Sequence, residues 1–282
     1  MLNEKREWLQ ANNINCFKAN INDEFSINSL IQQYKIDTIV NFAAESHVDN
    51  SIKNPNIFFE TNVLGTATLL NLAKKYDLRF HQIGTDEVYG ETTPDDWVED
   101  LYSNSVTINA EEKTLVPSSP YSSSKASADM IALSYHHTFG TKVTVSRCSN
   151  NAGKWQHPEK LIGTVISKAL KDEKIPVYGK GNQRRHWIDV DDHNMAIMNI
   201  LEKGKIGKIY NIGPVYENWI TNMQLIRFIL KCLDKPTTLI EHITDRLGHD
   251  TSYFLYPTED MPSRSYKKFM PEIVNWYKEN LT

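Results

Sequence analysis

The 282-residue chain has little of several features that would define its class. It has three cysteines, Cys16, Cys148 and Cys232, which are far apart and form no CxxC pair. That pattern argues against a disulfide framework or a structural metal site and favours a reducing compartment.

No apolar run approaches the roughly 18 residues that cross a bilayer. The charged first ten residues carry no apolar signal-peptide region. The net charge of -4 gives no reason to expect nucleic acid or a membrane surface as a partner. We therefore expect a cytoplasmic protein without a bound metal.

Glycine is also missing where a nucleotide-binding fold would need it. No glycine precedes Gly65, although a glycine-rich turn between a strand and a helix is what cradles a pyrophosphate in such folds. The one later Gly-x-Gly, at 179–181, follows an expected strand but leads into another expected strand. We therefore interpret it as a turn and not as a displaced phosphate loop.

Alternating strand and helix patterns run through the first half of the chain. Short apolar runs of the buried-strand type alternate with stretches in which apolar residues recur at helical spacing. Strands separated by helices of this length predict parallel βαβ units, and hence an α/β fold with a doubly wound, Rossmann-like parallel sheet. The expected strands are 38–43, 79–84 and 142–147, and the expected helices are 54–76 and 121–139.

The pattern becomes less regular after residue 151. We interpret 152–282 as a smaller α/β lobe packed on the sheet domain of 1–151. The polar stretch 91–120, rich in Thr, Ser, Asp and Pro, is expected to be a surface insertion. The expected helices of the second half are 158–172, 191–202, 221–233 and 271–280, and its expected strands are 175–178, 185–190 and 208–212.

Tyr121 and Lys125 form a candidate catalytic pair. Residues at i and i+4 share one helix face, so the hydroxyl and the ammonium can converge. A free tyrosine has a pKa of about 10, and a neighbouring ammonium lowers it towards that of a usable general base. In a chain with 13 Tyr and 31 Lys and Arg, however, about one such pair is expected by chance.

Thr85, Asp86 and Glu87 directly follow the expected strand 79–84. Ligands of open parallel sheets bind beyond the carboxyl ends of the strands, where adjacent side chains can offer one acid and one base. Capping of a helix or turn is the more common use of Thr and Asp at such a place. The metal-like Asp189-Val190-Asp191-Asp192-His193 precedes an expected helix, and capping is the better interpretation there too.

Seven motifs together resemble the extended short-chain dehydrogenase/reductases, and within them the dTDP-glucose 4,6-dehydratase family. They fall in that family's order and spacing over nearly all of the chain from about residue 15. A Thr-Asp-Glu at the strand end separates such dehydratases from related 4-epimerases and decarboxylases. The motifs are NFAAESHVD at 41–49, TDEVYG at 85–90, YSSSK at 121–125, RCSNN at 147–151, PEKLI at 158–162, YNIG at 210–213 and DRLGHD at 245–250.

The resemblance implies NAD-dependent dehydration of a nucleotide-activated glucose to its 4-keto-6-deoxy form, as in deoxysugar (rhamnose) biosynthesis. Tyr121 would remove the proton of the sugar 4-hydroxyl, and Lys125 would hold the nicotinamide ribose and lower the pKa of Tyr121. Glu87 would take the C5 proton, and Asp86 would protonate the departing C6 hydroxyl. Thr85 would align the 4-hydroxyl by a hydrogen bond.

The resemblance also assigns binding residues. Residues 1–151 would form an NAD-binding domain with the catalytic groups, and 152–282 a nucleotide-sugar-binding lobe that interleaves with it. Arginines suit the second task because their fork matches phosphate oxygens. The cofactor contacts would be Phe42, Ala43, Ala44, Glu45, Ser46, Thr61, Tyr121, Lys125 and Asn151, and the substrate contacts Ser46, Asn150, Lys160, Leu161, Pro176, Tyr178, Arg185, Arg246 and His249.

The chain departs from the family pattern at two places. Ala152, Lys154, His186 and Leu247 replace residues usual on the substrate side, which leaves dTDP and UDP open as the nucleotide. The family's opening strand, glycine-rich turn, helix and second strand have no counterpart, so the sheet is expected to be N-terminally truncated, with its third strand near Cys16–Asn20. An internal start within a longer gene, a split gene whose first unit is a separate chain, and a degenerate relative would each explain this.

Three functions compete on the sequence. The first is the NAD-dependent dehydratase, and the second is a non-catalytic or partner-dependent protein that binds a nucleotide-sugar. The third, a nucleotide-sugar epimerase, is disfavoured by Glu87 at the elimination position. By the same resemblance, a homodimer is expected to form through the helices 61–76 and 121–139.

Overall fold

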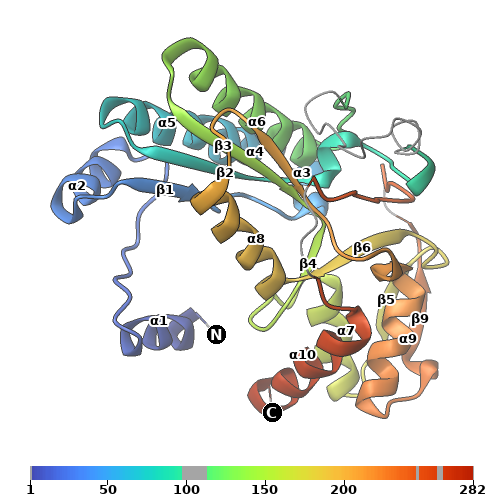
Figure 1. Ribbon diagram of the computed structural model, residues 1–282. Helices are drawn as coiled ribbons and strands as arrows, with labels where there is room; N and C mark the ends of the chain where they lie inside the picture. The colour runs from blue at the N-terminus through green and yellow to red at the C-terminus, as the bar shows by residue number, and fades with distance from the viewer. Residues whose placement is uncertain (1, 97–112, 246–247, 259–262, 282) are drawn as a thin grey trace.

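A four-stranded parallel sheet forms the centre of the first half of the molecule (Figure 1). The computed structural model describes residues 2–96, 113–245, 248–258 and 263–281. Most strand residues are buried, as is typical of parallel strands covered on both faces. The strand order is β1-β2-β3-β7, with β1 at Thr38–Asn41, β2 at Arg79–Thr85, β3 at Lys142–Cys148 and β7 at Ile209–Ile212.

Helices cover both faces of this sheet, which confirms the doubly wound α/β fold. On one face, α2 (Glu24–Tyr34), α5 (Gly65–Lys75) and α6 (Pro120–Phe139) pack against Phe80 and Val143. On the other face, α8 (Val190–Lys203) packs against the side chains of β2, β3 and β7. Figure 1 shows α5 and α6 above the sheet and α8 below it.

The predicted helix 54–76 is present but is not a uniform α-helix. It consists of α4 (Pro55–Phe58), a π-helical segment η1 (Phe59–Leu64) and α5. Such π segments are rare and are frequent at functional sites. Hydrophobic periodicity predicted the helix but could not predict this change of hydrogen bonding, which widens one turn and redirects its side chains.

The predicted strand near Cys16–Asn20 is wrong. This segment is irregular, and β1 is an edge strand that pairs only with β2 among the described residues. A strand needs a partner for its backbone N–H and C=O groups, and no described strand lies beside this segment. Before it, α1 (Leu2–Ala11) lies away from the sheet (Figure 1).

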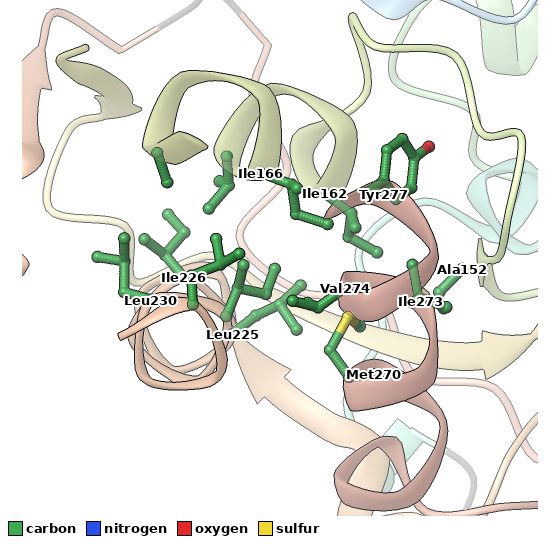
Figure 2. Packing of buried hydrophobic residues seen from close by; sticks show 14 of the residues in the cluster. Ala152, Ile162, Ile166, Leu225, Ile226, Leu230, Met270, Ile273, Val274 and Tyr277 are labelled. Atoms are coloured by element: carbon green, nitrogen blue, oxygen red, sulfur yellow. The ribbon is translucent and has the colours of Figure 1, made fainter. Parts of the chain in front are cut away.

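The second lobe has a core made by three helices, α7 (Leu161–Leu170), α9 (Asn222–Leu233) and α10 (Tyr266–Leu281). Figure 2 shows side chains from all three converging, with Ile162, Leu225 and Val274 fully buried. The helix predicted at 271–280 begins five residues earlier, because the buried Phe269 and Met270 anchor its first turns to this core.

Two small sheets complete this lobe. β6 (Arg184–Asp189) lies between β4 (Asn150–Ala152) and β8 (Trp219–Thr221), and β5 (Ile175–Tyr178) pairs in parallel with β9 (Ile240–Ile243). The predicted turn at 179–181 follows β5, with Gly179 and Gly181 at positive φ. The division of the chain at residue 151 remains a prediction about its domains.

The remaining short elements of the described residues include α3 (Val48–Lys53) and the 3-10 turns η2 (Asp86–Tyr89) and η5 (Thr237–Leu239). A further 3-10 turn, η4 (Tyr216–Asn218), contains the buried Asn218. The amide of Asn218 donates to the carbonyls of Trp187 and Arg264 at 2.9 Å each, so it joins β6 to the segment before α10. In the part of the chain that the structure describes, no helix has the length and apolarity to cross a membrane.

Candidate active site

The carboxyl ends of β2 and β3 open into a cavity of about 640 Å³, which residues from the second half of the chain also line. Ala43, Glu45 and Thr61 do not form part of its wall, and Arg246 lies outside the described residues. The structure therefore brings most of the predicted site residues together. Those in the wall are Phe42, Ala44, Ser46, Thr85, Asp86, Glu87, Tyr121, Lys125, Asn150, Asn151, Lys160, Leu161, Pro176, Tyr178, Arg185 and His249.

Thr85, Asp86 and Glu87 lie where β2 ends and η2 begins. Thr85 is the N-cap of η2, and its hydroxyl accepts a hydrogen bond from the Glu87 backbone N–H at 3.4 Å. The capping interpretation is thus correct for Thr85, and it does not compete with a role in the cavity. The cap turns the chain so that Asp86 and Glu87 follow directly at the cavity wall.

Asp86 is only 2% exposed. Burial, followed by the neighbouring charge of Glu87, raises the pKa of Asp86 to about 8, against the opposing effect of Arg185. A carboxyl group with that pKa is protonated at neutral pH and can donate a proton. Asp86 and Glu87 therefore offer an acid and an adjacent carboxyl group in one cavity.

Tyr121 and Lys125 lie in the first turns of α6. Ser119 and Ser122 form a reciprocal capping box with Pro120 in the first turn, which fixes the start of the helix next to the cavity. Lys125 reaches back to the sheet, where its Nζ donates to the carbonyl of Ile83 at 2.5 Å. The predicted i, i+4 pair is present on a helix, with both side chains in the cavity wall.

The net shift in the Tyr121 pKa is upward in this structure, opposite to the direction predicted from Lys125 alone. Burial raises the pKa of Tyr121 well above its ordinary value, and the charges of Glu87 and Cys148 add to this. A hydrogen bond with Thr85 opposes the shift, whereas the Lys125 ammonium is directed to the strand. The sequence could not show this, because it depends on burial and on carboxylates from another segment.

Asn62 supports the site from outside the cavity wall, and the sequence did not predict it. It is 1% exposed, and its amide accepts from the Glu45 backbone N–H at 2.8 Å and donates to the Glu45 carbonyl at 3.0 Å. The same Nδ2 donates to the Ser124 hydroxyl at 2.8 Å. Asn62 therefore joins the loop after β1 to the helix of Tyr121. Its only sequence signal is a polar residue within an apolar helix face.

Several buried polar atoms in the cavity wall have no hydrogen-bond partner among the residues described. They include Asn150 Oδ1, Ser149 Oγ, His193 Nε2 and Asn222 Oδ1. Buried polar groups are normally satisfied, so a polar ligand is the natural partner for such a set. Asn222 was not predicted because it follows a short strand. His193 was not predicted because it lies in the segment 189–193, which was interpreted as a helix cap.

Two hydrogen bonds join lining residues of the cavity. The Tyr178 hydroxyl donates to Asp49 Oδ2 at 2.9 Å, and Lys160 Nζ donates to the Ser46 carbonyl at 2.6 Å. Each joins the second lobe to the segment after β1. The Arg185 guanidinium, also in the cavity wall, donates to the Asp250 carbonyl at 2.9 Å and stacks over the Tyr253 ring at 4.3 Å from its centre.

The segment Asp189–His193 is a helix start, as predicted. The Asp189 side chain accepts from the Asp191 backbone N–H at 2.9 Å and caps α8. Within residues 2–96, 113–245, 248–258 and 263–281, no group of three or more His, Cys, Asp or Glu side chains could hold a metal ion. The cavity instead combines carboxyl, phenol, ammonium and amide groups.

Comparisons with known proteins identify the family. Residues 2–251 match the family model of the GDP-mannose 4,6 dehydratases. The chain belongs to this family. The dTDP-glucose 4,6-dehydratase of Mycobacterium tuberculosis is 37% identical to it over 274 residues, which are 95% of the chain and 79% of that relative. The resemblance predicted from the motifs is thus confirmed.

Solved 4,6-dehydratase structures agree with the fold. The dTDP-glucose 4,6-dehydratase of Streptomyces venezuelae, crystallised with NAD bound, superimposes with a TM-score of 0.83 at 38% identity. The superposition covers 93% of this chain and 79% of the Streptomyces venezuelae chain. The enzyme of Bacillus anthracis, in complex with NAD, gives a TM-score of 0.79 at 40% identity over the same shares.

Proposed function

We propose that this chain binds NAD and dehydrates a nucleotide-activated glucose, dTDP- or UDP-glucose, to its 4-keto-6-deoxy form. The observation that carries the proposal is the arrangement of Asp86, the adjacent Glu87 and Tyr121 around one cavity, where burial raises the pKa of Asp86 to about 8. An elimination of water needs an acid for the leaving group and a base for the carbon acid. Membership of the 4,6-dehydratase family agrees with that chemistry.

Each catalytic residue has a separate task. Tyr121 removes the proton of the sugar 4-hydroxyl, which Thr85 aligns. Glu87 takes the C5 proton, which the new C4 ketone makes acidic, and Asp86 gives its proton to the departing C6 hydroxyl. Bound NAD supplies a hydride acceptor for C4, a hydride donor for C6 and a positive nicotinamide ring. The buried Tyr121 requires positive charge nearby to ionise, because burial and Glu87 raise its pKa.

The residues of the cavity fit the cofactor. Asn151 and Lys125 lie in its wall with Phe42, Ala44 and Ser46. Ala43, Glu45 and Thr61 belong to the same proposed site although they lie outside the wall. Glu45 is held by both of its backbone groups, so the loop is positioned before a ligand arrives. Asn150 Oδ1 and His193 Nε2 have no hydrogen-bond partner among the described residues and remain for ligand groups.

We propose that the nucleotide-sugar binds on the side of the cavity that the second half of the chain lines. Arg185 is 5% exposed and backed by Tyr253, so its charge meets phosphate oxygens without strong solvent screening. We propose Asn222 as an added contact, because its Oδ1 is buried and unpartnered within the described residues. The other proposed contacts are Ser46, Asn150, Lys160, Leu161, Pro176, Tyr178, Arg246 and His249.

The proposal is tested by binding and turnover. Calorimetry measures NAD binding by the purified chain, and product analysis follows dTDP-glucose and UDP-glucose separately. Tyr121→Phe should stop oxidation at C4, whereas Glu87→Gln should still reduce the cofactor but release no 4-keto-6-deoxy product. A product inverted at C4 that has kept its water would favour the epimerase. A folded chain that binds NAD and consumes neither sugar would contradict the enzyme proposal.

A partner-dependent version of this function is supported by the edge of the sheet. Among the described residues β1 pairs only with β2, and β1 contributes Val40 to the cluster under α8. The large apolar side chain of Phe42, directly after β1, is 57% exposed. A parallel strand with a glycine-rich turn and helix, supplied by a separate chain, would cover this edge. Recovery of NAD binding on adding such a polypeptide, but not a scrambled one, would support this version.

The oligomeric state is part of the same proposal. We infer a homodimer that forms through α5 and α6, which lie together on one side of the sheet (Figure 1). Leu64, Met130 and Phe139 are large apolar residues on these helices and at the start of α5, and they are 59%, 44% and 50% exposed. Such side chains are favoured partners in a helix-to-helix interface.

A further inference from the structure

A carboxylate is buried one helical turn beyond Lys125. Asp129 on α6 is 0% exposed and shares the helix face of Lys125, because the two are four residues apart. Its Oδ2 accepts a hydrogen bond from Arg147 Nε at 2.9 Å, and Arg147 is 1% exposed. Burying such a pair is costly and brings no certain gain in stability, so its retention calls for another reason.

The two oxygens of this carboxylate have different surroundings. Oδ2 faces Arg147, whereas Oδ1 has no hydrogen-bond partner within the described part of the chain. Gly84 makes room for Oδ1, since a Cβ on that residue would lie 3.0 Å from it and 2.6 Å from the Ser146 carbonyl oxygen. Burial raises the pKa of Asp129, and the charge of Arg147, followed by that of Lys125, opposes this shift, so Lys125 is the second cation that favours the ionised carboxyl group.

The ion pair also connects the two catalytic segments. Arg147 Nη1 donates to the Tyr89 hydroxyl at 3.0 Å, and that hydroxyl donates to Asn211 Oδ1 at 2.7 Å. Tyr89 ends the 3-10 turn that begins at Asp86. A continuous set of buried contacts thus runs from the helix of Tyr121 and Lys125 to the turn of the proposed acid and base.

We propose that Asp129 is a positioning residue whose carboxylate, anchored by Arg147, keeps Lys125 a buried ammonium beside Tyr121. The proposal rests on the proposed dehydratase function for its catalytic meaning, but the charge of Lys125 is measurable without turnover. A neutral Lys125 would lose its electrostatic influence on the Tyr121 phenolate, and the general base would then form only at higher pH.

The charged surroundings of Lys125 agree with this role. Burial lowers the pKa of Lys125, and Asp129 is the strongest opposing group, followed by Cys148 on β3. Tyr121 lies on the same helix, and Arg147 lies beside Cys148 on β3. Burial and then Asp86 of η2 raise the pKa of Cys148 to about 12. Burial and then Glu87 of η2 raise that of Tyr121.

Two variants separate charge from structure. Asp129→Asn keeps the shape and leaves Lys125 and Arg147 without a carboxylate, so the pKa of Lys125 should fall by about one unit or more. The double variant Asp129→Asn with Arg147→Met also removes the second positive charge, so part of that fall should be recovered. A purely structural role predicts instead that the double variant is no better than the single one.

The readout is the side-chain resonance of Lys125 in protein carrying isotope-labelled lysine, titrated by NMR and assigned with Lys125→Met. Asp77→Asn is the matched control, because it removes one carboxylate from an exposed ion pair with Lys142. In the dependence of turnover on pH, the acidic limb should shift to higher pH in Asp129→Asn. It should return part of the way in the double variant.

Each outcome decides the proposal. An unchanged Lys125 titration in Asp129→Asn, or a lower pKa in the double variant than in the single one, would overturn it. If only the double variant folds, its Lys125 pKa must lie below that of the wild type, and an equal or higher value would count against the role. Absent turnover in the wild type would contradict the dehydratase proposal but leave the NMR comparison intact.

Discussion

The carboxyl group of Asp86 is buried beside Glu87, and this single residue links activity to stability. In the unfolded chain it titrates near an ordinary pKa of about 3.9, whereas in the folded protein its pKa is raised to about 8. Between these values the folded state holds the extra proton. The contribution of Asp86 to stability is therefore full below about pH 4 and declines as pH rises towards 8.

Asp86→Asn should for this reason be inactive yet more stable than the wild type at pH 8. The amide cannot give up a proton, so turnover should fall by about 10²–10⁴-fold. The melting temperature should exceed that of the wild type at pH 8, and the difference should shrink towards pH 4. Scanning calorimetry between pH 4 and pH 8 measures this difference in melting temperature, with Asp77→Asn as the exposed control. A gain that persists unchanged at pH 4 would show that the titration of Asp86 is not its cause.

At the scale of single residues, the sequence predicted which groups meet but not their protonation. Thr85, Asp86, Glu87, Tyr121 and Lys125 follow from motif and position, and all five lie in one cavity wall. The raised pKa values of Asp86 and Tyr121 depend on burial, which distant segments provide. Asn62 was missed because its partners lie 17 and 62 positions away.

Among the elements, the π segment η1 has a defined effect, because it turns Asn62 towards Glu45. Asn62→Ala should weaken NAD binding and lower stability, since the buried partners of the amide lose their hydrogen bonds at about 1–3 kcal/mol for each group left unsatisfied. Calorimetric titration with NAD and thermal unfolding measure the two effects. Thr68→Ala, which removes one exposed hydroxyl contact of the next helix, should change neither. Unaltered NAD affinity in Asn62→Ala would contradict a positioning role for η1.

The layer between the sheet and α8 should set the acid limit of the fold. Burial lowers the pKa of His81 to about 3 and that of His193 to about 4. Both imidazoles ionise near pH 6.5 in the unfolded chain, so stability should fall as pH drops from 6.5 towards 4. His81→Asn should make this decline shallower in urea titrations at several pH values, whereas the exposed His157→Asn should not. Equal slopes in all three proteins would contradict this origin.

Long elements were predicted better than short ones. The periodicity of α6 and α9 extends over several turns, and their ends carry caps that the sequence displays. The three-residue strands β4 and β8 have too few residues for a period, and their partners in β6 lie far along the chain. The strand near 16–20 was expected from the family resemblance, but the segment is irregular and has no described neighbour to pair with.

On the scale of the whole molecule, the exposed apolar residues of α5 and α6 predict the effect of a surface charge. Leu64→Glu combined with Met130→Glu should convert the proposed dimer to a monomer, because two charges would be buried without partners. Light scattering after gel filtration measures the mass. Met195→Glu and Met198→Glu on α8 are the matched control, being equally apolar and exposed on the opposite face. A dimer that survives the first pair would place the interface elsewhere.

The position of β7 has a consequence for synthesis on the ribosome. The central sheet takes three strands from the first 148 residues but completes itself with Ile209–Ile212, whose register begins opposite Val145. The nascent chain must therefore expose one side of β3 while some sixty further residues emerge, including much of the second lobe. Chaperones that shield apolar strand edges would find their substrate during that interval. A ribosome stall placed before residue 209 should trap a protease-sensitive sheet, and one placed well beyond it a resistant sheet.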